Sequence, residues 1–169
     1  SNINGLSDCL KENNSIWIGS DPSSTTNNAS GNVAIGINAL NSITTGDDNT
    51  ASGMAALRLN TTGNNNTASG AYSLYRNTTG GENTAYGYSS LKENVSGSNN
   101  TAFGRWALHS NTGSNNSGFG LNAGSSITTG SDNICIGGSS STSSVTSINQ
   151  IVIGKGASGH GDNIAVIGN

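Results

Sequence analysis

Glycine, small and polar residues follow one another along this chain in a pattern that returns about every 17 residues, an interval typical of repeat proteins. A glycine marks each repeat, and seven of the nine intervals between these glycines have the same length. The marker glycines are Gly19, Gly36, Gly53, Gly70, Gly87, Gly104, Gly120, Gly137, Gly154 and Gly168. An interval this short cannot enclose a separate domain, so each repeat must be one coil that buries its apolar atoms against its neighbours. The pattern predicts an elongated, all-β, parallel β-solenoid.

Each marker glycine closes a five-residue segment whose pattern predicts a short β-strand. The first position is asparagine in seven successive repeats, and the third is alanine or another small residue. The asparagines are Asn32, Asn49, Asn66, Asn83, Asn100, Asn116 and Asn133. Because successive coils lie about 4.8 Å apart, these side chains are expected to hydrogen-bond to one another along the rod. The glycine is expected where the chain bends out of the strand and a Cβ would obstruct it.

Further positions that carry the same type of residue in successive coils, which we call columns, follow the glycine. Leucine returns four residues after it in five coils and is expected to fill the coil interior, at Leu40, Leu57, Leu74, Leu91 and Leu108. A polar turn such as Asn60-Thr61-Thr62-Gly63 comes next, in which asparagine and threonine bond to nearby backbone and the glycine adopts a positive φ. We therefore expect short strands joined by tight corners, with residues 1–14 as a lead-in segment and residues 15–169 as the solenoid. The last coils have a shorter spacing.

The apolar columns are thin, which indicates association between chains. One column of alanine and one of leucine is a small core for a coil whose perimeter reaches about 17 × 3.3 Å. At both ends of the rod, however, the strands are apolar on both faces, as in Ile16–Ile18 and Ile151–Ile153. Such strands are typical of sheets that are covered on both sides. The sequence therefore predicts a homotrimer.

Composition and charge argue against several other classes. The chain has 31% hydrophobic and 9% charged residues and a formal net charge of −3, and its six basic residues are scattered along it. A basic footprint for a nucleic-acid backbone is therefore not expected. No stretch approaches the roughly 18 apolar residues of a membrane span, so membrane insertion is not expected either, nor does a secretory leader open the sequence.

The two cysteines are expected to be unpaired. Cys9 precedes the first coil, whereas Cys135 falls in the small-residue column about seven coils further along, far beyond the reach of a disulfide. Cys135 is therefore interpreted as a small buried residue of the core.

Several segments resemble known fibre proteins. Ser15–Gly19, Asn32–Gly36, Asn149–Ala157 and Asn163–Gly168 are similar to the head repeats of trimeric autotransporter adhesins, although the shorter interval that is usual there occurs only between Gly154 and Gly168. The run of Asn-Thr-Ala-x-Gly with Asn-Thr-Thr-Gly resembles the repeat regions of bacteriophage tail fibres and of fibre-like bacterial surface proteins. The resemblance covers residues 15 to 169. Many of these fibres end in an endosialidase-type chaperone domain, which would lie outside this sequence.

The resemblance implies a structural and adhesive fibre segment, a shaft or tip, that forms or presents a receptor-binding surface. Its partners would be two further copies of the chain and a cell-surface glycan or envelope receptor on a host or prey cell. Its location would be extracellular, in a virion tail fibre or a bacterial surface fibre, and the sequence does not separate these two. Such repeats serve as scaffold for different targets, so the receptor itself stays open.

Two other functions are compatible with parts of the sequence. A glycan-degrading tailspike would need two carboxylates roughly 5 to 9.5 Å apart, and Asp48, Glu82 and Asp132 share one corner column. These are turn residues with no apolar pocket to tune an acid, so we expect neither an enzyme nor a cofactor or metal site. An ice-binding solenoid is the other alternative, because paired threonines recur at coil spacing, as in Thr61-Thr62 and Thr78-Thr79.

Receptor contacts are expected at the variable positions of the middle coils. Aromatic and cationic side chains gather there, and an exposed aromatic ring beside a cation can stack on a sugar or hold an anionic glycan. The candidate receptor-contact residues are Tyr72, Tyr75, Arg76, Lys92, Arg105, Trp106 and His109. An alternative interpretation is that Tyr72 and Trp106 pack between the chains of a trimer, since aromatic residues are enriched at interfaces.

Overall fold

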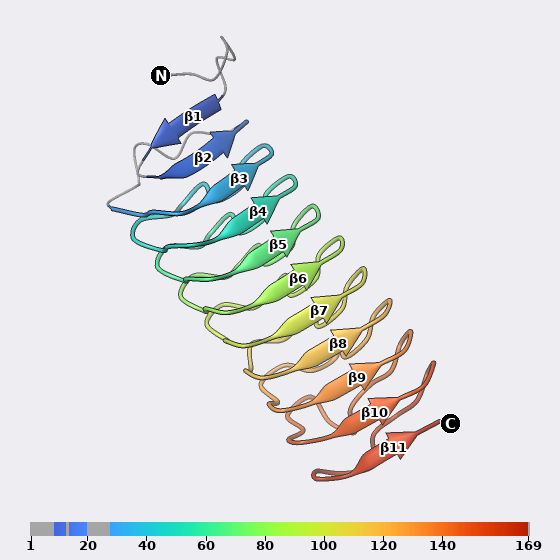
Figure 1. Ribbon diagram of the computed structural model, residues 1–169. Coiled ribbons are helices and arrows are strands. Elements are labelled where there is room, and N and C mark those ends of the chain that lie inside the picture. Colours follow the sequence, from blue (N-terminus) through green and yellow to red (C-terminus); the bar gives the residue numbers. More distant parts are fainter. Residues whose placement is uncertain (1–8, 13, 20–27, 169) are drawn as a thin grey trace.

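The computed structural model describes residues 9–12, 14–19 and 28–168. The chain forms a parallel β-solenoid of about eight turns with about 17 residues in each turn. Figure 1 shows the coils stacked into a rod, with the N-terminal strands at one end and β11 at the other. The strands are β1 (Cys9–Glu12), β2 (Ser15–Ile18), β3 (Val33–Ile35), β4 (Thr50–Ser52), β5 (Thr67–Ser69), β6 (Thr84–Tyr86), β7 (Thr101–Phe103), β8 (Ser117–Phe119), β9 (Ile134–Ile136), β10 (Ile151–Ile153) and β11 (Ala165–Ile167).

The strands form one sheet in chain order, and from β2 to β11 every neighbouring pair is parallel. The register places Ala51 beside Ala68 and Ala68 beside Ala85, so equivalent positions of the repeat meet, as the sequence predicted. Most of the predicted lead-in segment lies outside the described residues. Its strand β1, which the repeat did not predict, pairs antiparallel with β2 and covers the first edge of the sheet.

The predicted asparagine ladder is confirmed. Asn83 donates from Nδ2 to Oδ1 of Asn66 at 3.0 Å and to the carbonyl oxygen of Gly97 at 2.9 Å. Its own Oδ1 accepts from the backbone N–H of Asn100 at 3.0 Å and from the Asn100 side chain at 3.1 Å. All of these side chains are fully buried. The ladder therefore satisfies backbone groups at the corner as well as linking the coils.

The leucine column fills the coil interior as expected, and every one of its five side chains is fully buried. The interior also contains a second polar column, at positions where the sequence predicted an ordinary turn. Asn77 donates to Asn60 Oδ1 at 2.8 Å, and Asn94 donates to Asn77 Oδ1 at 3.0 Å. The shortened coil interrupts this column, so Asn94 Oδ1 is buried without a hydrogen bond from a described residue. Hydrogen-bonded amides thus complete a core that apolar residues alone would leave thin.

Glycine is required at two places in each coil, after the strand and in the polar turn, and for a different reason at each. The marker glycines adopt positive φ, such as +123° at Gly87, as predicted for the bend after the strand. The prediction of positive φ was wrong for the glycines of the polar turn, none of which has it. A Cβ on Gly80 would instead clash with the carbonyl oxygen of Gly97 and lie 2.6 Å from Asn77 Oδ1. There, glycine is needed because successive coils approach each other closely.

The outward side of the sheet is apolar over most of its length. We call the outward-facing residues of β2–β11 the sheet face. Its rings stack in parallel, with centroids 5.1 Å apart for Tyr86 and Phe103 and 5.6 Å apart for Phe103 and Phe119. No charged residue occupies an outward position of these strands. Exposed large side chains of the sheet face are Ile16, Ile18, Ile35, Tyr86, Phe103, Phe119, Ile136, Ile151 and Ile167. The apolar character predicted for the two ends therefore also reaches the middle coils.

Cys135 is a free, buried cysteine of the small-residue column, as expected. Burial raises the pKa of its thiol to about 11, so the thiolate that would act as a nucleophile is disfavoured. The side chain of Cys9 lies outside the described part of the chain.

Candidate functional site

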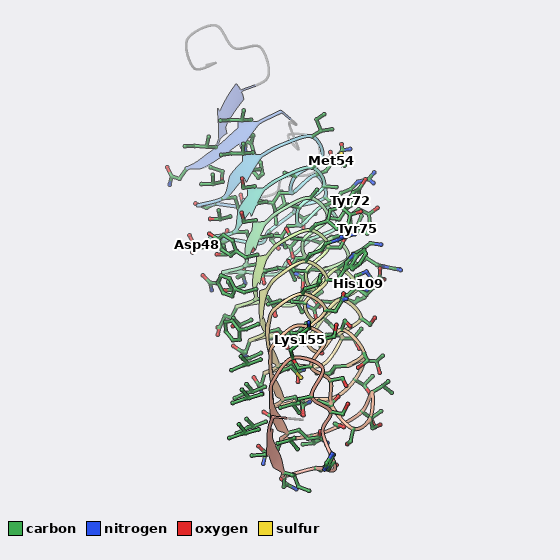
Figure 2. All side chains as sticks on the ribbon, turned by 90° about the vertical axis from the view of Figure 1, so that its right-hand side faces the viewer. Asp48, Met54, Tyr72, Tyr75, His109 and Lys155 are labelled. Atoms are coloured by element: carbon green, nitrogen blue, oxygen red, sulfur yellow. The ribbon has the colours of Figure 1, made fainter. Side chains whose placement is uncertain are left out.

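Aromatic and basic side chains from four successive coils meet on the side of the rod that follows the strand ends. We call this group the aromatic–cationic surface, and it consists of Arg58, Tyr72, Tyr75, Tyr88, Lys92, Arg105, Trp106 and His109. Figure 2 shows Tyr72, Tyr75 and His109 on one side of the rod and Asp48 on the other. Some of these positions lie just after the bend at the end of a strand. The others lie in the middle of the segment that leads back to the next strand, directly after the leucine of the coil interior. The repeat thus brings together residues as far apart in the sequence as Arg58 and His109.

The rings form a continuous series along the rod. Tyr72 lies 5.8 Å from Tyr75 and 6.0 Å from Tyr88, and Tyr88 lies 6.4 Å from Trp106, measured between ring centroids. All three contacts are edge-to-face, with interplanar angles between 61° and 79°. This geometry is the favoured one for aromatic pairs and holds the rings in place against each other.

The corner backbone supports this arrangement. Tyr72 and Trp106 both adopt φ of 59°, a left-handed conformation that is uncommon for bulky residues. Ala55 occupies the equivalent position of an earlier coil with φ of 58°. The coil therefore imposes the conformation whichever residue is present, and it turns the side chains of Tyr72 and Trp106 onto the same edge of the rod.

Two arginines lie against these rings. The guanidinium carbon of Arg105 is 3.8 Å from the ring centroid of Trp106 and 5.8 Å from that of Tyr88. The guanidinium of Arg58 is 5.8 Å from the Tyr75 ring, and its Nη1 donates to the Tyr75 hydroxyl at 3.1 Å. Within the described part of the chain, neither arginine forms an ion pair. Both are held by cation–π contacts that leave their charge without a carboxylate partner.

Lys92 and Arg76 share a single carboxylate. Glu93 lies 3.2 Å from Arg76 and 3.5 Å from Lys92, measured between the charged nitrogen and oxygen atoms. Beside them, burial and the charge of Lys92 lower the pKa of His109, while Glu93 opposes the effect. His109 is therefore neutral at neutral pH, and its ring can both donate and accept a hydrogen bond.

Two shallow depressions flank Trp106 and its neighbours. One has a volume of about 300 Å³ and is lined by Tyr72, Tyr75, Tyr88, Ser89 and Lys92. The other has a volume of about 410 Å³ and is lined by Trp106, His109, Ser110, Asn122 and Ser125. Both are open to solvent and are lined by rings together with hydroxyl, amide or amine groups. Such a surface suits a ligand that has apolar faces and many hydroxyl groups.

Comparisons with protein-family models, with curated proteins and with solved structures found no match. In the described residues, no helix is long and apolar enough to span a bilayer, and no group of three or more His, Cys, Asp or Glu side chains is placed to hold a metal ion.

Six of the seven candidate receptor-contact residues lie on the aromatic–cationic surface. Arg76 lies next to it, one position further along its coil, where it pairs with Glu93. Tyr88 and Arg58 belong to the surface but are not among the residues predicted from the sequence. Tyr88 stands in the same column as Arg105, one coil earlier. Arg58 stands in the same column as Tyr75, also one coil earlier. Reading each variable column across neighbouring coils would have found both.

The residues of the two alternative functions lie elsewhere. Asp48 and Glu82 precede β4 and β6, two coils apart, and both are exposed. Glu82 lines a depression of about 340 Å³ whose other lining residues are polar or glycine. In the threonine pairs, the first hydroxyl is already used within the fold, since Thr61 Oγ1 donates to the Thr78 carbonyl oxygen at 3.0 Å and Thr78 Oγ1 donates to that of Val95. The second threonine of each of these pairs, Thr62 and Thr79, is exposed, whereas the first is half-buried.

Proposed function

We propose that this rod is an extracellular adhesive fibre segment whose aromatic–cationic surface binds cell-surface carbohydrate. The observation that carries the proposal is the series of rings from Tyr72 to Trp106, which stand at positions that hold no aromatic residue in the other coils. Scaffold positions of a solenoid repeat from coil to coil, whereas these residues differ between coils and gather in only four of them. Variable residues on rigid repeats are where such proteins place recognition.

Carbohydrate is favoured over other ligands by the chemistry of the surface. Rings can stack on the apolar faces of sugars, while Ser89, Ser110, Asn122 and the neutral His109 can bond to hydroxyl groups. The depressions are shallow and open, which suits an extended chain better than a compact small molecule. A host or prey envelope displays such chains, in keeping with a virion tail fibre or a bacterial surface fibre.

We further propose that three copies assemble with their sheet faces toward a common axis. Large apolar side chains occupy the sheet face at both ends and from β6 to β8, with an interruption at β4 and β5, whose outward residues are Thr and Ser, and no charge stands among them. Such a face is uncommon on the surface of a monomer and marks a protein interface. The aromatic–cationic surface begins after the strand ends, so this arrangement would leave it outside. Tyr72 and Trp106 would then be available to a ligand, in contrast to the alternative that they pack between chains.

The size of the sheet face favours three chains over two. Strands of three residues make it about 10 Å wide, and the nine steps from β2 to β11 make it about 43 Å long. The resulting footprint of roughly 400 Å² is about half of what each partner contributes to a stable pairwise interface. In a trimer each chain meets two neighbours, so the total area that each chain buries is larger than in a dimer.

Replacement of Trp106 by alanine tests carbohydrate binding. The variant should keep its fold, because Ala55 already occupies the equivalent corner with nearly the same φ. On an array of bacterial, algal and animal glycans, we expect its affinity for the best wild-type ligand to fall at least about tenfold, as for aromatic anchors at other interfaces. Ile37→Ala, which shortens an exposed side chain on the same edge outside the surface, should bind as the wild type does.

Two results would contradict the proposal. One is the absence of any glycan bound by the wild-type protein on the array. The other is a Trp106→Ala variant that keeps its circular dichroism spectrum and binds the same glycans with unchanged affinity.

A further inference from the structure

The charges of the solenoid are sorted onto two separate edges. Four basic residues lie at or beside the aromatic–cationic surface, where Glu93 is the one carboxylate among the described residues. They are Arg58, Arg76, Lys92 and Arg105. The other described carboxylates of the coils lie at the opposite edge, just before the strands begin, and are Asp47, Asp48, Glu82, Asp132 and Asp162. A chain with a net charge of −3 therefore carries a distinctly basic edge.

From this arrangement we propose that the ligand is an acidic glycan, a linear chain whose sugars carry carboxylate or sulfate groups, lying along the rod axis. The inference rests on the proposed carbohydrate binding and adds the chemical class. Arg58 and Arg105 supply its recognition, since each places a guanidinium beside a ring and lacks a carboxylate partner among the described residues. A ring and an adjacent guanidinium match the two parts of an acidic sugar, its apolar face and its anionic group.

The spacing of these groups fits an extended chain. Arg58 and Arg105 belong to coils three steps apart, or about 14 Å along the axis, with Lys92 between them. The rings of Tyr72, Tyr88 and Trp106 follow one another by one coil each, which is about the advance of one sugar residue. An acidic glycan parallel to the rod would thus meet rings in three successive coils, from Tyr72 to Trp106, with Arg58 and Arg105 at its two ends and Lys92 between them.

The carboxylates of the opposite edge strengthen the preference for acidic chains over a general polyanion. They lie across the sheet from the surface and would repel a polyanion that wraps around the rod. The basic edge extends over only a few coils. Its cations are separated by aromatic rings and do not form a continuous row. Nucleic acid, which is held mainly through many phosphate contacts, is therefore a poor match.

The inference is tested by replacing an arginine of the protein and measuring its binding to a matched pair of ligands, one acidic and one neutral. The best acidic ligand from the glycan array is compared with its neutralised derivative, made by reducing the carboxyl groups or removing the sulfates. We expect the wild type to bind the acidic form at least about tenfold more tightly, with an affinity that falls as salt is raised. Arg105→Gln should lose about tenfold for the acidic form and less than about twofold for the neutral one, as expected for the loss of a charged hydrogen bond.

Lys155→Gln is the matched control. Lys155 stands in the same column as Arg105, three coils further along, away from the rings. The substitution removes one positive charge from the same edge, as Arg105→Gln does. If the position of Arg105 matters and not the net charge, the affinity of Lys155→Gln for the acidic form should change less than about twofold.

The outcomes separate this inference from the proposed function. Tight binding of neutral glycans, with no loss on neutralisation of an acidic one, would overturn the acidic class while leaving carbohydrate binding intact. Binding of no glycan would overturn both. Equal losses for Arg105→Gln and Lys155→Gln, or equally tight binding of a DNA oligonucleotide of the same charge, would show a general attraction to polyanions and would also overturn the inference.

Discussion

Replacing Gly87 by alanine is expected to destabilise the solenoid by about 3–5 kcal/mol, or to prevent it from folding, as other severe core disruptions do. Gly87 has φ of +123°, a conformation that an alanine rarely adopts. The added Cβ would lie 2.7 Å from the carbonyl carbon and oxygen of Gly104 in the next coil. Both contacts are with backbone, so relief requires the two coils to separate and the hydrogen bonds between them to lengthen.

Gly138→Ala is the matched control for this substitution. Gly138 has no positive φ, and a Cβ placed on it would meet a single atom within 4 Å, the carbonyl oxygen of Leu121 at 3.9 Å. Alanine there should leave stability unchanged or raise it slightly, because the unfolded chain loses freedom. Chemical denaturation followed by circular dichroism measures both. Equal midpoints for Gly87→Ala and Gly138→Ala would contradict the close stacking of the coils.

Replacing Asn83 by aspartate is expected to cost about 3–5 kcal/mol at neutral pH, the range for a buried charge without a compensating partner. The substitution keeps the size of the side chain but removes the Nδ2 donor. Asn66 Oδ1 and the Gly97 carbonyl oxygen would then face a carboxylate where they now accept hydrogen bonds of 3.0 and 2.9 Å. Because the site is fully buried, neither group can turn to water.

The loss should depend on pH in a definite direction. Burial and the two facing acceptors would raise the pKa of the introduced carboxyl in the folded protein, so the folded state would bind a proton more readily than the unfolded chain. The destabilisation should therefore be largest above the raised pKa and shrink as pH falls through it. Asn99→Asp is the control, since this exposed position has φ of 60° and its equivalents Asp48 and Asp132 already carry aspartate with φ of 56° and 59°. Similar denaturation midpoints for the two variants at pH 7 would contradict the role of the buried ladder.

The regular part of the fold could be predicted from sequence because each coil places the same residue in the same environment. An asparagine at one register in seven coils has few roles other than a ladder, and a leucine at a fixed distance from a glycine must point inward if the coil is to have a core. The period also determined which residues stack, so the parallel register followed without further information. Repetition here provides the information that an alignment of relatives provides for other folds.

The features that escaped prediction depend on contacts within a coil or on residues that do not repeat. A glycine in a turn predicts a positive φ, whereas Gly80 is required because the next coil approaches it closely. Asn60 and Asn77 were interpreted as turn residues, since the repeat does not reveal that the turn folds inward. Strand β1 lies outside the repeat and left no periodic signal.

Part of the candidate site could be predicted from the sequence. Tyr72, Tyr75 and Trp106 stand out by type, and the period placed them on one edge. The contacts that make the surface distinctive required the structure, above all Arg105 over Trp106 and the separation of basic and acidic residues onto two edges. Tyr88 and Arg58 stand in the columns of Arg105 and Tyr75, so comparing each variable column between neighbouring coils would have added them to the candidates.

Sedimentation equilibrium of the purified chain tests most directly the claim that this rod functions as an assembled fibre, with its sheet face inward and its aromatic–cationic surface outward. For a trimer we expect a mass three times that of the 16.9 kDa chain. We also expect that Phe103→Lys, which places a charge in the middle of the sheet face, reduces the mass to that of one chain, while Trp106→Ala leaves it unchanged. A wild-type protein that sediments as a single folded chain would contradict the account.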